Sequence, residues 1–191
     1  MLNRFSIKQR MLLIIALVFV LYVCMIIFSI NGSNHVEEIS LAAVEKIMLE
    51  DQKDKLKVAT NSLSIAISQG IKILDSESEK IEAIRRAVDG IRFEKDKSSY
   101  YFVYKDTTCI SLTTKKELQG KDLRDVKDKN GVYVIAGLRD RAKAGGGFLE
   151  YIWPKLNAGD VPKLSYSEMI PGTDFWIGTG VYMDNIAEEE A

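Results

Sequence analysis

The hydrophobic and polar positions divide the chain into an apolar N-terminal run, a long helical stretch and a series of short strands. Residues 11–30 contain no charged side chain, and residues 1–10 before them carry three basic side chains and no acidic one. At about 1.5 Å per residue, a twenty-residue helix spans the roughly 30 Å hydrocarbon core of a membrane. We therefore expect a retained transmembrane anchor at 11–30. The alternative is a cleaved signal peptide, but the run is long for one and no small-residue cleavage site follows it.

The basic flank of this run also predicts its orientation. Positively charged flanks stay on the cytoplasmic side, so we expect residues 1–10 in the cytoplasm and the rest of the chain outside it. The expected location is the inner (plasma) membrane, with a single membrane pass and a periplasmic or extracellular domain.

Residues 31–75 show the spacing of an amphipathic helix. Apolar side chains recur at intervals of three and four through two stretches, Val36 to Met48 and Leu56 to Ile71. One helix of this length favours pairing with a second copy of the chain, so we expect a homodimer. The alternative is a pair of helices with a break in the charged stretch 50–55.

From residue 76 the pattern changes to short elements. Ser76 and the acidic residues after it predict the start of a second helix over 76–92. A third helix is expected over 131–144, and 154–161 is expected to be a hairpin loop. Alternating apolar and β-branched residues predict five strands, at 100–104, 109–113, 148–153, 163–169 and 175–183. This order predicts an α+β fold in which helices cover at least one face of a five-stranded antiparallel sheet.

The composition and the residue spacing argue against several classes of function. The net charge is −1, which gives no reason to expect nucleic acid as a partner. His35 is the only histidine, and the two cysteines, Cys24 and Cys109, have no metal-ligand spacing. The segment Gly178–Gly180 precedes the end of the chain and not a helix, so it lacks the helix N-terminus that holds a phosphate. We expect no catalytic residue, no metal and no cofactor.

Several stretches closely resemble one family of sensor domains. They read "AIRRAVDGIRFEKDKSSYYFVY", "ELQGKDLRDVKDKNG", "GGGFLEYIWPK", "PKLSYSEM" and "FWIGTGVYMDNI", in this order, between Ile81 and Ile186. They resemble the single-Cache domain, in its second variety, of bacterial methyl-accepting chemotaxis proteins and histidine kinases. The resemblance places this domain at 76–186 and leaves 187–191 as a tail.

The resemblance implies a PAS-like antiparallel sheet, a long N-terminal helix and a ligand cavity between the sheet and its loops. It also implies a small organic acid as ligand, such as acetate, propionate, pyruvate or lactate, and signalling in chemotaxis or a two-component system. This chain departs from the family at Thr113-Thr114, where a His-Pro is frequent, and at Ser99, where a glycine is frequent. Loss of the histidine removes a ligand contact, which puts the ligand class in question.

A carboxylate ligand requires hydrogen-bond donors inside an apolar cavity. Aromatic and basic side chains on the predicted strands supply them, and the candidate ligand-binding residues are Trp153, Tyr166, Lys163, Tyr151 and Tyr101. Strand alternation puts Lys163 and Tyr166 on opposite faces, and a bulge at Pro162 would change this. For each aromatic residue the other interpretation is sheet core, and for Lys163 it is a solvated position at a strand edge.

Two other functions compete with an organic-acid sensor. The chain could be a degenerate module of a truncated receptor, which binds no ligand and acts in dimerisation or protein interaction. It could also be an anchored enzyme, although no nucleophile–base pair or metal-binding set supports that hypothesis.

Overall fold

The computed structural model describes residues 7–156 and 158–184, without the side chains of 9–10, 13–14, 29–43 and 45. It divides into two compact units, Met1–Ile47 and Met48–Ala191. Helix α1, Ile7–Ile71, is the element that both units share. The helix continues through 50–55, so the two-helix alternative is wrong. The expected tail at 187–191 lies outside the described residues.

In the first unit, the large apolar side chains that the structure describes between Met11 and Phe28 are all exposed. In the part of the chain that is described, no helix reaches both the length and the hydropathy needed to cross a membrane. The expected anchor at 11–30 includes positions 13, 14, 29 and 30, whose side chains lie outside the description.

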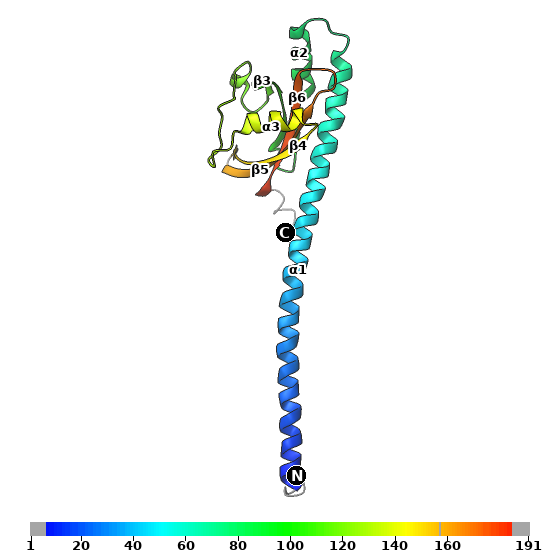
Figure 1. Ribbon diagram of the computed structural model, residues 1–191, viewed down its shortest axis with the longest axis vertical. Coiled ribbons are helices and arrows are strands. Elements are labelled where there is room, and N and C mark those ends of the chain that lie inside the picture. Colours follow the sequence, from blue (N-terminus) through cyan, green and yellow to red (C-terminus); the bar gives the residue numbers. More distant parts are fainter. Residues whose placement is uncertain (1–6, 157, 185–191) are drawn as a thin grey trace. The chain divides into compact units, whose positions relative to one another are not determined.

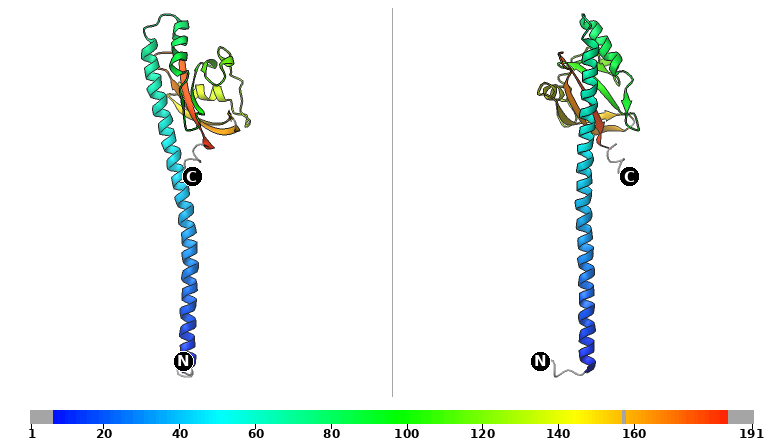
Figure 2. Two further views of the ribbon diagram at one scale, coloured as in Figure 1. Left: turned by 180° about the vertical axis from the view of Figure 1, so that it is seen from behind. Right: turned by 90° about the vertical axis from the view of Figure 1, so that its right-hand side faces the viewer.

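In the second unit, α2 covers Glu77–Val88 and begins where the sequence predicts. The Ser76 hydroxyl accepts a hydrogen bond from the Glu79 backbone N–H, and the Glu79 carboxylate accepts one from the Ser76 backbone N–H. This reciprocal pair satisfies two backbone donors that a helix start would otherwise leave unpaired. The helix is shorter than expected, because Arg92 belongs to a strand. Figure 2 shows α2 beside the end of α1 in both views.

The sheet is antiparallel and has six strands among the described residues. Five follow the expected order along the chain: β2 Ser99–Lys105, β3 Thr108–Leu112, β4 Gly147–Lys155, β5 Gly159–Met169 and β6 Phe175–Tyr182. The sixth is the two-residue β1, Arg92–Phe93, which pairs with the start of β2. The expectation of five strands is therefore wrong by one, because two residues carry no detectable alternation. The long strands lie in the order β3-β2-β6-β5-β4. Figure 1 labels β3, β4, β5 and β6 of this sheet.

The β4–β5 hairpin is longer than the sequence predicts. Residues expected to form its loop, 154–161, mostly continue the two strands, and Pro154 pairs with Asp160. β4 is at the edge of the sheet, where a proline can occur without breaking a ladder on its open side. Pro162 is tolerated for a related reason, since the pairing of β5 with β6 begins only at Lys163.

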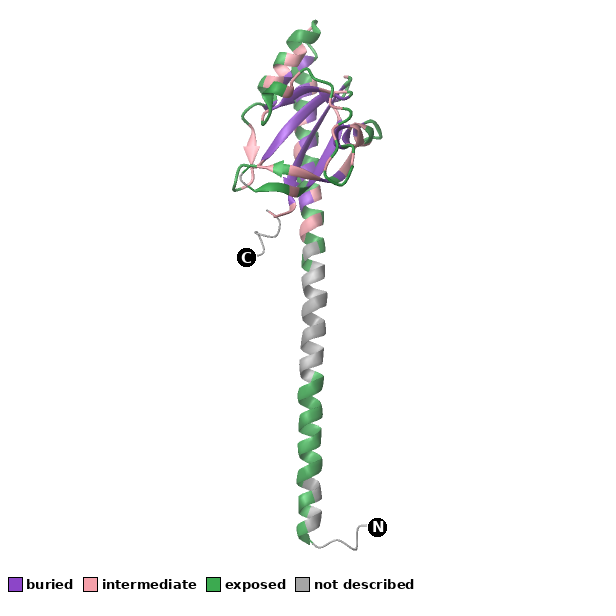
Figure 3. Ribbon diagram, turned by 90° about the vertical axis from the view of Figure 1, so that its left-hand side faces the viewer, coloured by how far each residue is buried: buried purple, intermediate pink, exposed green. Residues whose placement is uncertain are grey.

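Helices cover both faces of the sheet, which buries most of its strands (Figure 3). One face carries Tyr101, Val103, Phe175 and Ile177, and it packs against the end of α1 and against α2. The opposite face carries Tyr100, Phe102, Tyr104 and Trp176. It packs against α3, Val134–Lys143, and the segment before it, which includes the short 3-10 turn η2, Lys116–Leu118. The predicted α+β fold with an antiparallel sheet is confirmed.

Candidate ligand-binding site

The register of the sheet determines which candidate side chains can meet. Tyr151 of β4 lies opposite Lys163 of β5, and residues opposite each other in an antiparallel pair point to the same face. Trp153 is two residues from Tyr151 and shares that face, with the two rings 5.5 Å apart. Three of the five predicted residues, Tyr151, Trp153 and Lys163, are therefore neighbours on the face that α3 covers.

A cavity of about 940 Å³ opens beside this group. Its aromatic lining comes from Tyr100, Trp153 and Tyr182, one from each of β2, β4 and β6. The loop after β3 contributes Thr113 and Thr114, and the end of β4 contributes the residues that lead into the hairpin. Most of the other lining residues are polar or charged, so the cavity combines an aromatic wall with many polar groups.

Lys163 is not part of the cavity lining but lies against two tyrosines that are, Tyr100 and Tyr182. Its Nζ atom is 4.0 Å from the centre of the Tyr100 ring and 4.6 Å from that of Tyr182. The residue is only 1% exposed, and the ammonium forms no hydrogen bond of ordinary geometry with the described residues. The Tyr100 side chain lies close enough to raise the pKa of Lys163 against the effect of burial. Aromatic faces attract a cation but do not replace the hydrogen bonds it has in water. The Lys163 ammonium therefore has hydrogen-bond donors that the described residues do not satisfy with ordinary geometry.

Burial and neighbouring charges change the pKa values in this group. Burial lowers the pKa of Lys163, Tyr100 opposes that effect, and the positive charge of Arg92 adds to it. Burial also disfavours ionisation of Tyr100. The charge of Lys163 and hydrogen bonds from neighbouring side chains outweigh this, so the pKa of Tyr100 lies below its ordinary value. The protonation of Lys163 and that of Tyr100 are thus linked, and burial and charge act on both groups.

Two hydroxyl groups complete the polar surroundings. The Thr113 hydroxyl is buried in the cavity wall and has no hydrogen-bond partner in the described part of the chain. The Tyr151 hydroxyl, in contrast, is 2.9 Å from the Ser165 hydroxyl and forms a hydrogen bond with it. Thr113 can therefore donate to a ligand, whereas Tyr151 supports the site from behind.

An ion-pair cluster lies at the mouth of the cavity. The Lys155 ammonium is 2.9 Å from the Asp96 carboxylate and 2.8 Å from that of Asp184. It is also 5.5 Å from the centre of the Tyr182 ring. Burial opposes ionisation of Asp96, but hydrogen bonds from Ser98 and Lys155 lower its pKa to about 2. Lys155 thus joins the β1–β2 loop, the end of β4 and the residue pair after β6.

The remaining two predicted residues lie on the other face of the sheet. Tyr166 packs against Phe148, with ring centres 4.9 Å apart, and its hydroxyl donates to Glu168 at 3.3 Å. Tyr101 packs among the apolar residues that face α1 and α2. Neither contacts the cavity described above, and both have the sheet-core role that the sequence left as their alternative.

Sequence reasoning missed four residues that the structure places at or beside the cavity: Arg92, Tyr100, Thr113 and Tyr182. A signal existed for Thr113, because it stands where related domains often have a histidine. Tyr100 and Tyr182 were visible as aromatic strand residues, but alternation alone does not show which face of a sheet holds a ligand. No pattern marked Arg92, because its strand has only two residues.

The glycines of β6 make room for neighbouring side chains. A Cβ atom at Gly178 would collide with the Phe102 ring, and one at Gly180 would collide with the Ser165 hydroxyl. These glycines allow β2 and β5 to place their side chains against β6 and do not form a phosphate loop.

A second cleft, of about 900 Å³, lies between the end of α1, the start of α2 and the β5–β6 turn. Lys105 there is already paired with Glu77 and Asp174, each at 2.8 Å. The buried donors without partners that the structure describes are absent from its lining. Nor is any group of three or more metal-ligating side chains found among the described residues. The cavity beside Lys163 is the stronger candidate site.

Comparison with known proteins agrees with this fold. The model of the Cache domain matches residues 25–190. The chain belongs to the Cache domain family. The resemblance inferred from the sequence motifs is confirmed, and the match begins well before Ile81, within the long helix. Cache domains are sensor modules of membrane receptors.

The relatives of this Cache domain are receptor proteins. It is 32% identical over 156 residues to the sensor histidine kinase MctS of Rhizobium johnstonii, which covers 80% of this chain and 33% of that kinase. It is also 32% identical to a solved methyl-accepting chemotaxis protein of Vibrio parahaemolyticus, with a TM-score of 0.67, covering 77% of this chain and 99% of the solved chain. A Cache chemosensory domain solved for its carboxylic acid recognition has a TM-score of 0.64 at 22% identity, covering 73% of this chain and 98% of the other. That last likeness concerns the fold alone.

Proposed function

We propose that this Cache domain senses a small organic acid, whose carboxylate binds the Lys163 ammonium and the Thr113 hydroxyl. The observation that carries the proposal is the buried Lys163 ammonium, which forms no hydrogen bond of ordinary geometry with the described residues. A carboxylate would supply charge-assisted hydrogen bonds, which are about twice as strong as neutral ones. Acetate, propionate, pyruvate and lactate are the first ligands to test. Carboxylic acid recognition by a Cache domain of the same fold supports this choice.

The two tyrosines in front of Lys163 give the domain a means of response. Tyr100 and Tyr182 line the cavity and cover the ammonium, so a carboxylate reaches it only when these rings shift. Tyr182 ends β6, and the next described residues include Asp184, which Lys155 holds. A ligand that prefers the shifted arrangement would change the population of the two states and the position of the segment after β6.

The receptor around this domain is also part of the proposal. We infer that residues 11–30 anchor the chain in the inner membrane with the Cache domain outside the cytoplasm, in a chemotaxis or two-component system. The uncharged run and its basic flank support the anchor. Retention of the full chain in the membrane fraction after an alkaline carbonate wash is the expected result, and release into the supernatant would count against the anchor.

A second copy of the chain is the partner proposed for α1. Val58 and Ile65 are seven residues apart on this helix, and their exposed fractions are 65% and 46%. Residues at this spacing lie on one side of a helix, as in paired helices. In a Cys24→Ser background, Val58→Cys should form a disulfide-linked dimer on mild oxidation. Arg86→Cys, on the exposed surface of α2, is the control that should not.

Calorimetry with the purified full chain in detergent tests ligand binding. Propionate is compared with propionamide, which has nearly the same shape but no charge. Propionate, or another of the four acids, is expected to release or absorb heat and to raise the unfolding temperature, whereas propionamide is not. If neither these four acids nor a short dicarboxylic acid does either, the domain is better described by the rival function, a module that binds no ligand and acts in dimerisation.

A further inference from the structure

The ring of Tyr100 carries a second cation besides Lys163. The centre of the Arg92 guanidinium is 5.2 Å from the centre of this ring, and the Lys163 ammonium is 4.0 Å from it. Because both distances are measured to the same ring centre, the separation of the two charges is at most the sum of these two distances. Two cations on one aromatic ring repel each other, and an anion that reaches both relieves that repulsion.

Arg92 is available for such an anion. Its backbone is fixed by pairing with Tyr100 in the β1–β2 ladder, and its side chain lines the cavity. The guanidinium forms no ion pair or hydrogen bond with the described residues; it lies over the Tyr100 ring, and its charge acts on Lys163. A planar guanidinium suits two parallel hydrogen bonds to a carboxylate.

The rest of the cavity lining is also positive. Its cationic residues are Arg92, Lys97, Lys115 and Lys155, and its acidic residues are Asp96 and Asp184. Both carboxylates bind Lys155, which leaves the other three cations unneutralised by the acidic residues of the lining. Lys163 adds a further positive charge next to the lining. A ligand with a single carboxylate would meet only part of this charge.

We propose that the ligand carries two acidic groups, one held by Lys163 and Thr113 and the other held nearer the mouth by Arg92. This inference rests on the proposed function, because it requires that Lys163 receive a carboxylate. It adds that the ligand is a short dicarboxylate that passes along the Tyr100 ring, and it makes Arg92 the residue that distinguishes diacids from monoacids.

Calorimetry with matched acids tests the inference on the full chain. Butyrate and succinate have the same number of carbons and differ by one carboxylate, and malonate and glutarate vary the span between the two charges. One of the diacids is expected to bind the wild type at least about tenfold more tightly than butyrate, since a second charge-assisted hydrogen bond is gained.

Three variants decide the role of Arg92. Arg92→Gln is expected to remove the preference for the diacid, and Arg92→Lys to keep part of it, because it retains the charge but loses the paired geometry. Arg86→Gln, the same change on the exposed surface of α2, should keep the full preference. Thermal unfolding of each variant without ligand checks that the variant is folded. If Arg92→Gln does not fold, the comparison of Arg92→Lys with the wild type still tests the role of Arg92.

The outcomes separate this inference from the proposed function. If butyrate binds as tightly as every diacid, or if the diacid preference survives in Arg92→Gln, the inference is overturned while the sensing of organic acids stands. If no acid of either kind binds, both are wrong.

Discussion

Replacing Lys163 with methionine should have opposite effects on ligand binding and on the stability of the free protein. Methionine has a similar length and no charge, so Lys163→Met removes the ammonium without leaving a large cavity. The side chain is 1% exposed and contacts the faces of Tyr100 and Tyr182. The perturbation therefore tests the charge and not the packing.

The effect on stability follows from two opposing contributions. Each ring attracts the ammonium by up to about 2 kcal/mol when the cation is desolvated, whereas burial of an ion costs several kcal/mol. Burial lowers the pKa of Lys163, and the direction of that shift indicates that the cost of burial is the larger contribution. Apolar replacement of buried ionic groups is often neutral or stabilising by about 1–4 kcal/mol. At about 2–4 °C per kcal/mol, the ligand-free variant should unfold at the same temperature or up to roughly 16 °C higher.

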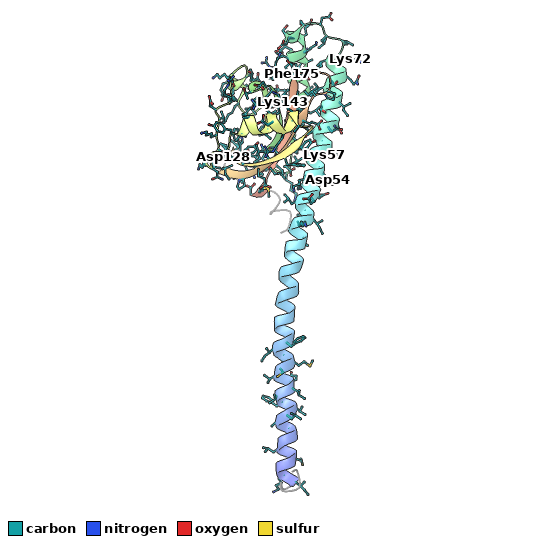
Figure 4. All side chains as sticks on the ribbon, in the orientation of Figure 1. Asp54, Lys57, Lys72, Asp128, Lys143 and Phe175 are labelled. Atoms are coloured by element: carbon teal, nitrogen blue, oxygen red, sulfur yellow. The ribbon has the colours of Figure 1, made fainter. Side chains whose placement is uncertain are left out.

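The effect on binding has the other sign. A hydrogen bond to a charged group contributes about 1.5–3 kcal/mol, so its loss should weaken the binding of the acid by at least about tenfold. Thermal unfolding and calorimetry of the same preparations measure both effects. Lys57→Met, the same change at an exposed position of α1 labelled in Figure 4, is the control and should alter neither.

Two results would refute this reasoning. One is an unchanged affinity for the acid in Lys163→Met, which would remove Lys163 from the site. The other is a lower unfolding temperature of the ligand-free variant, which would show that the two rings more than offset the burial of the charge.

Three further predictions concern pH, packing and a loop. The pKa of Lys163 in the folded protein lies below the ordinary lysine value of about 10.4. Binding of the organic acid should therefore weaken as pH rises through the pKa of Lys163. The stability of the wild type relative to Lys163→Met should increase between the pKa of Lys163 in the folded protein and the ordinary value. Titrations of affinity and unfolding temperature against pH check both signs. Gly180→Ala should destabilise the fold by more than about 1 kcal/mol, since its Cβ collides with Ser165, whereas Gly70→Ala in an open stretch of α1 should stabilise it by about 0.5–1 kcal/mol; denaturant unfolding measures both. Asp128→Ala should unfold at a lower denaturant concentration than the wild type in the same assay, because its carboxylate accepts hydrogen bonds from three backbone N–H groups, including that of Ile152 in β4.

Each of these three has a contradicting result. An affinity that stays constant to pH 10 would show that the ligand does not need the Lys163 charge. Equal stability of Gly180→Ala and the wild type would mean that β5 can move away from β6. If Asp128→Ala were as stable as the wild type, water would have to replace the carboxylate in the 128–132 loop. Figure 4 labels Asp128 in this loop.

The sequence predicted most of the fold because its patterns are local. The Ser76 capping box, the long helical spacing and the alternation of five strands each follow from residues close to one another in the chain. The exceptions have physical reasons as well. β1 is too short to alternate. Pro154 falls in the predicted loop and Pro162 just before the predicted strand, although each occupies a strand position where a proline breaks no essential hydrogen bond.

The candidate site was only partly predictable. Alternation correctly separated Lys163 from Tyr166, but it could not show which set faces the cavity. That depends on where α1 and α2 pack, and the helices cover the face of Tyr166 and Tyr101. Lys163 was assigned to a strand edge in the alternative interpretation. Its burial results from the order of the sheet, which places β5 between β4 and β6.

The most direct test of the central claim is a crystal structure of the protein grown with the tightest-binding acid. The account predicts a carboxylate within hydrogen-bond distance of the Lys163 ammonium and the Thr113 hydroxyl, with the rings of Tyr100 and Tyr182 shifted to admit it. A ligand bound in the cavity with its carboxylate away from Lys163, or bound in the cleft between α1 and α2, would contradict the account.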